Sequence, residues 1–88
     1  MTKNFNEYTR YLSMEIAKLR KEIPEVMSGF SQMAQGATKE GVLDKKTKEL
    51  IAMALAVANR CDGCIGFHAQ ALVKLEASRE EFMETLGM

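Results

Sequence analysis

Apolar residues recur at steps of three and four along most of this chain, and this spacing constrains its fold more than any other feature. From Asn4 to about Ile23 the apolar positions form one stripe of a long amphipathic helix: Phe5, Tyr8, Leu12, Ile16, Leu19 and Ile23. No run alternates apolar and polar residues between turn residues, as a half-buried strand would. The sequence therefore predicts an all-α fold.

Boundary signals divide the rest of the chain into four further helices, predicted at about 24–36, 45–59, 64–75 and from 79 onward. Pro24 suits the first turn of the second helix, where its missing N–H costs no hydrogen bond. Asp44 is placed to cap the third helix. Ser78 and Glu81 have the spacing of a capping box at the start of the fifth. We expect about five helices in a single domain covering residues 1–88.

The third predicted helix contains the longest apolar run, the nine residues from Leu50 to Ala58. This run is about half of what a bilayer-spanning helix needs, so we expect no association with a membrane. Since it is apolar on every face, it should be buried, surrounded by its own domain or by neighbouring subunits. Lys45, Lys46 and Lys48 at the start of this helix oppose its dipole, a local cost that folding alone does not explain.

Size and charge limit the classes of partner. A chain of 88 residues is near the size at which a single core is only modestly stable, which favours a homo-oligomer. The 12 Lys and Arg residues balance the 12 Asp and Glu residues, and no basic stripe is interleaved with aromatic residues, so no nucleic acid is expected as a partner. Residues 1–6 are polar and lack the basic and apolar regions of a secretory signal, so a cytoplasmic location is expected.

The residues that carry chemistry are Glu49, Cys61, Cys64 and His68, in the pattern E-x11-C-x2-C-x3-H. Cysteines three residues apart in a helical turn have Cα atoms about 5 to 5.5 Å apart, which a disulfide accepts. A nearby imidazole and carboxylate can move the protons that thiol chemistry requires. If the third and fourth helices form an antiparallel hairpin, Glu49 and His68 lie at similar depth, with a water able to span the remaining gap. The pattern predicts a redox catalyst whose CxxC lies at the start of the helix that follows the buried apolar helix.

Other interpretations of these four residues stay open. The cysteines could be small buried hydrophobes, and His68 a core histidine, on one continuous apolar stripe. Cys61, Cys64, His68 and Glu49 could supply four zinc ligands, but structural zinc sites usually pair two such knuckles, so no metal is predicted. Covalent haem is excluded because Ile65, and not His, follows the second cysteine. No strand precedes the CxxC as in thioredoxin, and no cofactor is expected.

The stretch from Leu43 to Phe82, which holds this motif, resembles the core of the carboxymuconolactone decarboxylase and alkylhydroperoxidase D superfamily, in its CxxC-bearing branch. The resemblance implies an all-helical domain that assembles into homo-oligomers, commonly trimers or hexamers. It also implies weak peroxidase or disulfide reductase activity on a hydroperoxide or disulfide substrate, with recycling by a thiol reductant such as a lipoyl-bearing protein. Where the family often has Gly before the Ser of the following helix, this chain has Glu76-Ala77-Ser78.

The resemblance also assigns roles by position. Cys64 corresponds to the cysteine that attacks the peroxide, and Cys61 to the one that gives a proton and then resolves the sulfenic acid as a disulfide. Glu49 and His68 correspond to the family's proton relay. Two other functions stay open: a non-redox lyase or isomerase that uses Glu49 and His68, and a non-catalytic oligomeric module that senses redox state. The decarboxylase branch generally lacks the cysteine pair.

Overall fold

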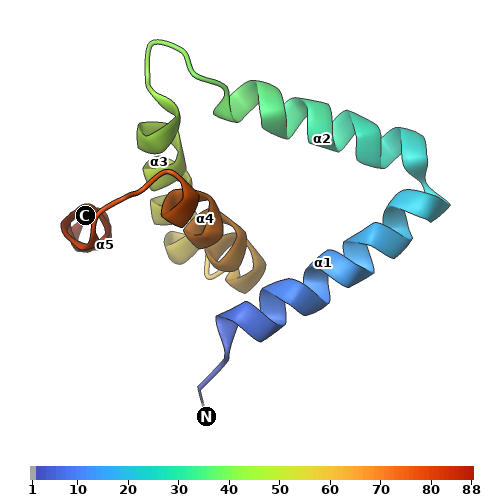
Figure 1. The fold of residues 1–88 in the computed structure, drawn as a ribbon, viewed down its shortest axis with the longest axis horizontal. Helices are drawn as coiled ribbons and strands as arrows, with labels where there is room; N and C mark the ends of the chain where they lie inside the picture. Colours follow the sequence, from blue (N-terminus) through green and yellow to red (C-terminus); the bar gives the residue numbers. More distant parts are fainter. Residues whose placement is uncertain (1) are drawn as a thin grey trace. The chain divides into compact units, whose positions relative to one another are not determined.

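The computed structural model describes residues 2–88, and this part of the chain forms five α-helices and no β-strand. The helices are α1 (Phe5–Glu22), α2 (Pro24–Thr38), α3 (Lys45–Ala58), α4 (Asp62–Lys74) and α5 (Arg79–Gly87) (Figure 1). The predicted all-α fold of about five helices is confirmed. The chain divides into two compact units, one ending at Lys39 and the other running from Glu40 to Met88, and each is described by itself. No helix among the described residues is both long and apolar enough to cross a membrane.

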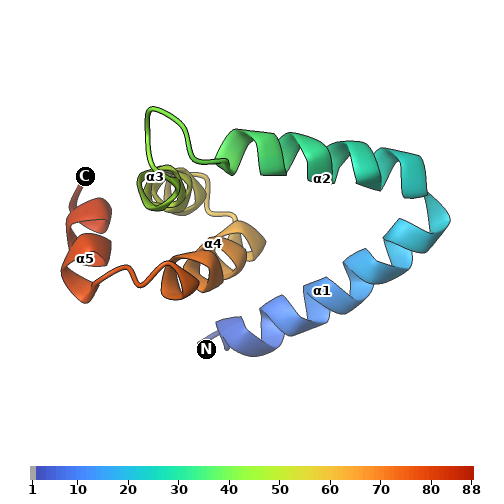
Figure 2. The same ribbon diagram turned by 45° about the horizontal axis from the view of Figure 1, so that its top comes forward.

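The first unit contains only α1 and α2, which meet at a corner and diverge from it (Figure 2). Asn4 caps α1 by accepting a hydrogen bond from the backbone N–H of Glu7, at 3.1 Å. Pro24 opens α2, as predicted, because it cannot continue α1. Several large apolar side chains of both helices are exposed, among them Tyr11, Met14, Leu19, Val26, Phe30 and Met33.

The second unit contains α3, α4 and α5, with α4 and α5 both packed on α3. Its core consists of Met53 and Ala56 from α3 and Leu72 from α4, which are 4%, 4% and 0% exposed. Burial of a leucine of this kind contributes about 1.5–3 kcal/mol to folding, so this small core is what joins α3 to α4. Asp44 caps α3 as predicted, because its Oδ1 accepts a hydrogen bond of 2.7 Å from the backbone N–H of Thr47.

The expectation that α3 is surrounded on all sides is not met by its own unit. Ile51, Leu55 and Val57 of the apolar run are 46%, 57% and 41% exposed. Two helices can cover only part of a third, and α4 and α5 leave the remaining face of α3 open. Cover by neighbouring subunits, the other half of that expectation, stays a prediction.

Helix α5 is fixed at its start by two sets of contacts. Ser78 and Glu81 form the predicted capping box: the backbone N–H of each donates to the side chain of the other, at 2.8 and 3.1 Å. Glu81 also accepts an ion pair from Lys46 Nζ at 2.9 Å, which ties α5 to the start of α3. The hydrogen bond and charge of Glu81 raise the pKa of Lys46. This contact accounts for one of the lysines that oppose the dipole of α3.

The turns that follow α3 and α4 share one geometry. Arg60 and Glu76 have φ angles of 55° and 60°, in the left-handed region, and each follows the last residue that caps its helix. The next residue then donates a backbone hydrogen bond of 3.0 Å back into the helix, to Ala56 and Leu72 respectively. These are Schellman turns, whose left-handed position usually holds glycine. A residue with a Cβ costs about 1 kcal/mol there, so the chain adopts both turns at some expense.

Candidate active site

The two cysteines lie at the start of α4 and are joined as a disulfide. Their Cα atoms are 5.2 Å apart, within the separation that the sequence spacing predicts. Helix α4 begins at Asp62, earlier than predicted, so Cys61 is its N-cap residue. The Cys61 Sγ accepts a hydrogen bond of 3.3 Å from the backbone N–H of Cys64. The dipole and free amides at a helix start stabilise a thiolate, so on reduction Cys61 occupies a position that favours its charged form.

Glu49 and His68 form a direct pair between α3 and α4. The Oε2 of Glu49 lies 2.7 Å from Nδ1 of His68, and their side chains are 6% and 31% exposed. The contact needs no bridging water, unlike the sequence-based expectation, because α3 and α4 pack more closely at this level. A buried carboxylate requires a partner, and His68 provides it. Glu49 therefore faces inward and is buried, as the apolar run after it predicts.

This pairing fixes the chemistry available to His68. A carboxylate can only accept hydrogen bonds, so when Glu49 is ionised and His68 is neutral, the imidazole donates its Nδ1 proton to Glu49. The other ring nitrogen, Nε2, then carries the lone pair and can take up a proton, and the imidazolium that results is stabilised by the adjacent carboxylate. Because His68 is partly exposed, a proton taken up there can leave to solvent or to a bound molecule.

All four predicted site residues lie in the second unit, on the paired helices α3 and α4. Cys64 and His68 are four residues apart in α4, which places them one turn apart on the same face. The disulfide and the Glu49–His68 pair therefore belong to one region of the hairpin. Among residues 2–88, no group of three or more His, Cys, Asp and Glu side chains is arranged to hold a metal ion.

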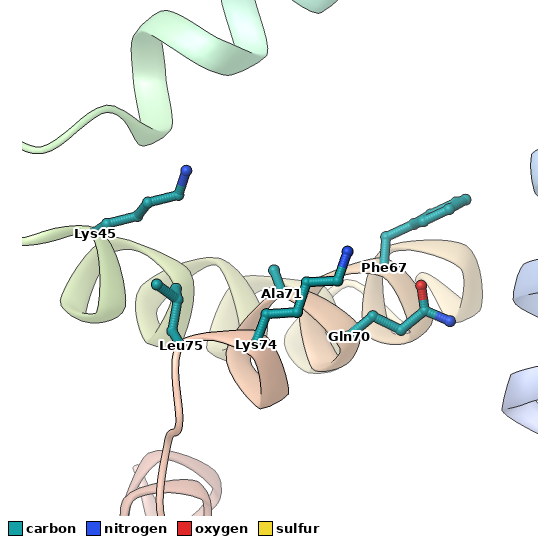
Figure 3. Close-up of a pocket in the computed structure, with 6 residues that line it drawn as sticks. All are labelled: Lys45, Phe67, Gln70, Ala71, Lys74 and Leu75. Atoms are coloured by element: carbon teal, nitrogen blue, oxygen red, sulfur yellow. The ribbon is translucent and has the colours of Figure 1, made fainter.

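A groove of about 410 Å³ beside α4 was not predicted from the sequence. It is lined by residues of α3 and α4 and of the turn after α4: Lys45, Phe67, Gln70, Ala71, Lys74 and Leu75 (Figure 3). A signal for it was present in the spacing, because Phe67, Ala71 and Lys74 follow Cys64 at three, seven and ten residues. At 3.6 residues per turn these three residues lie within about 80° of Cys64, on one side of it, whereas Lys45 is brought there only by the packing of α3.

Comparison with known proteins shows the family to which this chain belongs. A family model described as the carboxymuconolactone decarboxylase family matches residues 24–88, well over half of the chain. The chain belongs to this family. It is also similar to a crystal structure of the apo form of a carboxymuconolactone decarboxylase family protein from Legionella pneumophila, with 67% identity and a TM-score of 0.93. That match covers 96% of this chain and 75% of the Legionella chain.

Two curated relatives extend the family comparison. The protein H16_B0147 from Cupriavidus necator is 34% identical over 88 residues, which cover all of this chain and 78% of the relative. A protein from Haemophilus influenzae is 36% identical over 70 residues, or 80% of this chain. The matched part is 62% of the Haemophilus protein's length, less than two thirds. Both relatives are named as uncharacterized proteins, so the function proposed below is argued from the site of this chain.

Proposed function

We propose that this protein is a thiol-dependent peroxidase or disulfide oxidoreductase that works through Cys61 and Cys64. The observation that carries the proposal is the pairing of two features on one helix hairpin. A disulfide spans the start of α4, and a buried carboxylate holds an imidazole one turn further along the same helix. The disulfide is the oxidised product of the proposed cycle, and the imidazole is the base that the cycle requires.

In the first step the reduced Cys64 attacks a hydroperoxide. Nε2 of His68 takes the thiol proton, and the thiolate attacks the terminal oxygen of the hydroperoxide, so that an S–O bond forms, the O–O bond breaks and an alkoxide is displaced. The leaving alkoxide takes a proton from the His68 imidazolium and departs as an alcohol. Sulfur is oxidised to sulfenic acid and the peroxide is reduced, while Glu49 stabilises the transient positive charge on His68.

In the second step Cys61 resolves the sulfenic acid. Cys61, at the N-cap of α4, gives its thiol proton to Nε2 of His68 and attacks the Cys64 sulfur as a thiolate; the S–S bond forms and the S–O bond breaks. The leaving hydroxide takes the proton back from the His68 imidazolium and departs as water. The 5.2 Å separation of the Cα atoms is compatible with the S–S bond. An external dithiol, for which a lipoyl-bearing protein is our candidate, then reduces the disulfide by two thiol exchanges and is itself oxidised.

A second function is favoured by one observation. The Glu49–His68 pair is a complete acid–base unit without any sulfur atom, so it could serve a non-redox lyase or isomerase. Such an enzyme would keep its activity when both cysteines are replaced by serine. A redox sensor without turnover is the third possibility, and it would change its association on oxidation without consuming peroxide.

The test is a count of free thiols on the fully reduced protein. One equivalent of an organic hydroperoxide should remove two thiols per chain, and dihydrolipoamide should restore both. Cys64→Ser should abolish peroxide consumption, whereas Cys61→Ser should reduce one equivalent and keep a sulfenic acid that a dimedone probe captures. An unchanged thiol count would contradict the proposal and favour the lyase. Thiol loss without repeated turnover in the presence of dihydrolipoamide would favour the sensor.

A further inference from the structure

The groove beside α4 has an apolar floor. Phe67, Ala71 and Leu75 form it, and all three are partly buried. Its volume of about 410 Å³ is in the range of small-molecule sites. Every residue that lines it belongs to the second unit, so the groove is complete within the part of the chain that also holds the cysteines.

Two ammonium groups stand at the rim of this floor. Figure 3 shows Lys45 of α3 and Lys74 of α4 projecting to the same side as Phe67. Within residues 2–88, neither Nζ has a carboxylate at ion-pair distance; Glu40 accepts a hydrogen bond from Lys45, but from its backbone N–H, at 2.9 Å. Two like charges beside one cavity repel each other, and an anion bound between them would remove that repulsion.

The position of Lys45 in its helix strengthens this reading. A positive charge in the first turn of α3 opposes the helix dipole. Lys46 has the same disadvantage but is offset by Glu81, at 2.9 Å. Among residues 2–88, Lys45 has no carboxylate at ion-pair distance from its Nζ, and it lines the groove (Figure 3). The charge of Lys45 opposes the helix dipole and no ion pair in the described residues compensates for it, which favours a bound anion at this position.

The direction of the groove links it to the cysteines. Lys74 follows Cys64 by ten residues, which places it about 15 Å further along α4 and about 80° around the helix at 3.6 residues per turn. Phe67 and Ala71 lie between Cys64 and Lys74 both along the helix and around it. A molecule with its anionic end at the two lysines and its aliphatic part on Phe67 and Ala71 would direct its far end toward the start of α4.

We propose that this groove binds the carboxylate end and aliphatic chain of a fatty-acid-type molecule whose hydroperoxide group, remote from the carboxylate, reacts at Cys64. This inference rests on the proposed peroxidase function and gives it a substrate class. A neutral hydroperoxide lacks the group that Lys45 and Lys74 hold, so it is a poorer substrate at the same reactive centre.

The experiment uses one matched pair of substrates, linoleic acid hydroperoxide and its methyl ester, with dihydrolipoamide as reductant. The double variant Lys45→Gln, Lys74→Gln should lower kcat/KM for the acid by about three- to tenfold, through KM, and leave the ester unchanged. A control variant, Lys18→Gln with Lys21→Gln, removes the same charge from α1, outside the groove. Added salt should weaken the preference for the acid in the wild-type protein.

Decanoate carries no peroxide, so calorimetry of decanoate binding measures recognition by the groove independently of peroxide turnover. Decanoate should bind the wild-type protein and the control variant, and bind the double variant several-fold more weakly. Equal decanoate binding and an equal acid-to-ester ratio in the double and control variants would overturn the groove proposal, whatever the turnover. Groove-dependent decanoate binding without turnover of either hydroperoxide would overturn the hydroperoxide assignment together with the proposed function, and would leave a carboxylate site.

Discussion

The two units of this protein are built from similar helices but differ in what those helices cover. The α3–α5 unit buries Met53, Ala56 and Leu72 in a core of its own. In the α1–α2 unit, as far as it is described, the one buried side chain is Thr9, whose hydroxyl donates to the backbone carbonyl of Phe5 at 2.7 Å. Several large apolar residues of that unit, such as Met33 at 65% exposure, are exposed to solvent.

This difference shows that a sequence can form a helix without burying the helix's apolar face. Capping and apolar spacing produce α1 and α2 as well as they produce α3 and α4. A chain gains stability from an apolar stripe only when another surface removes it from water. We infer that the exposed apolar residues of α1 and α2, with Ile51 and Leu55 of α3, are covered by other copies of the chain, in the homo-oligomer that the sequence predicts.

The largest expected effect on the free energy of unfolding comes from a substitution in the core of the second unit, compared with one on its surface. Leu72→Ala should lower the free energy of unfolding by about 2–5 kcal/mol, because it leaves a cavity at a fully buried site. Val73→Ala, at a neighbouring residue of the same helix that is 69% exposed, should change it by less than about 0.5 kcal/mol. Urea denaturation measures both. Equal losses would mean that Val73 is covered in the assembled protein.

Substitutions on the exposed surface of the first unit should change self-association more than folding stability. Met33→Glu places a charge on the exposed apolar stripe of α2 and should weaken self-association by about tenfold or more, because burying an unpaired charge is costly. Gln32→Glu, on the neighbouring exposed residue, adds the same charge as a control. Analytical ultracentrifugation over a dilution series gives the dissociation constants. A monomeric wild-type protein would refute the inferred cover of the first unit.

A smaller effect is expected at the turn between α4 and α5. Glu76→Gly should raise the free energy of unfolding by about 0.5–1 kcal/mol, since glycine adopts the left-handed φ of 60° without a Cβ clash. Glu76→Ala serves as the control, because it keeps a Cβ and should give no such gain. Thermal unfolding of the three proteins at one concentration measures the difference. A loss of stability in the glycine variant would show that the Glu76 side chain makes a contact that outweighs the strain.

The smallest effect concerns the attachment of α5 in acid. The backbone N–H of Ser78 and, after it, the hydrogen bond and charge of Lys46 lower the pKa of Glu81 below its ordinary 4.5. A carboxyl with a lowered folded-state pKa stabilises the fold fully above its unfolded pKa, and this contribution is lost as the pH falls through the folded pKa. Protection of α5 amides from hydrogen exchange, compared with protection in α4, should therefore decline below about pH 4.5.

The matched variants for this pH effect are Glu81→Gln and Glu80→Gln, two adjacent residues in the first turn of α5. The first should flatten the pH dependence and lower protection at neutral pH, whereas the second should keep the wild-type profile. Because the Lys46–Glu81 pair is partly exposed to solvent, 0.5 M salt should also reduce the effect. An identical acid profile in both variants would assign the pH dependence to other carboxyl groups.

Much of the site could be predicted because its residues are linked by short-range geometry. The spacing of Cys61 and Cys64 fixes a Cα separation suited to a disulfide, and the apolar run after Glu49 implies a buried carboxylate in need of a partner. The start of α4 was misplaced because Cys61 is an unusual N-cap residue, with a sulfur where a serine or aspartate is typical. The bridging water expected between Glu49 and His68 was unnecessary, because the helix separation depends on side chains that no local pattern specifies.

The sequence by itself determined the five helices, the caps at Asp44 and Ser78 and the candidate residues of the site, since these depend on residues within one or two turns of each other. Only the tertiary structure decided which groups separated along the chain meet: Glu49 with His68, Lys46 with Glu81, and Lys45 with the groove along α4. It also decided which apolar stripes are left open. The physical reason is that contacts between helices depend on the fit of whole surfaces, and a periodic pattern shows that a helix has an apolar face without showing what covers it.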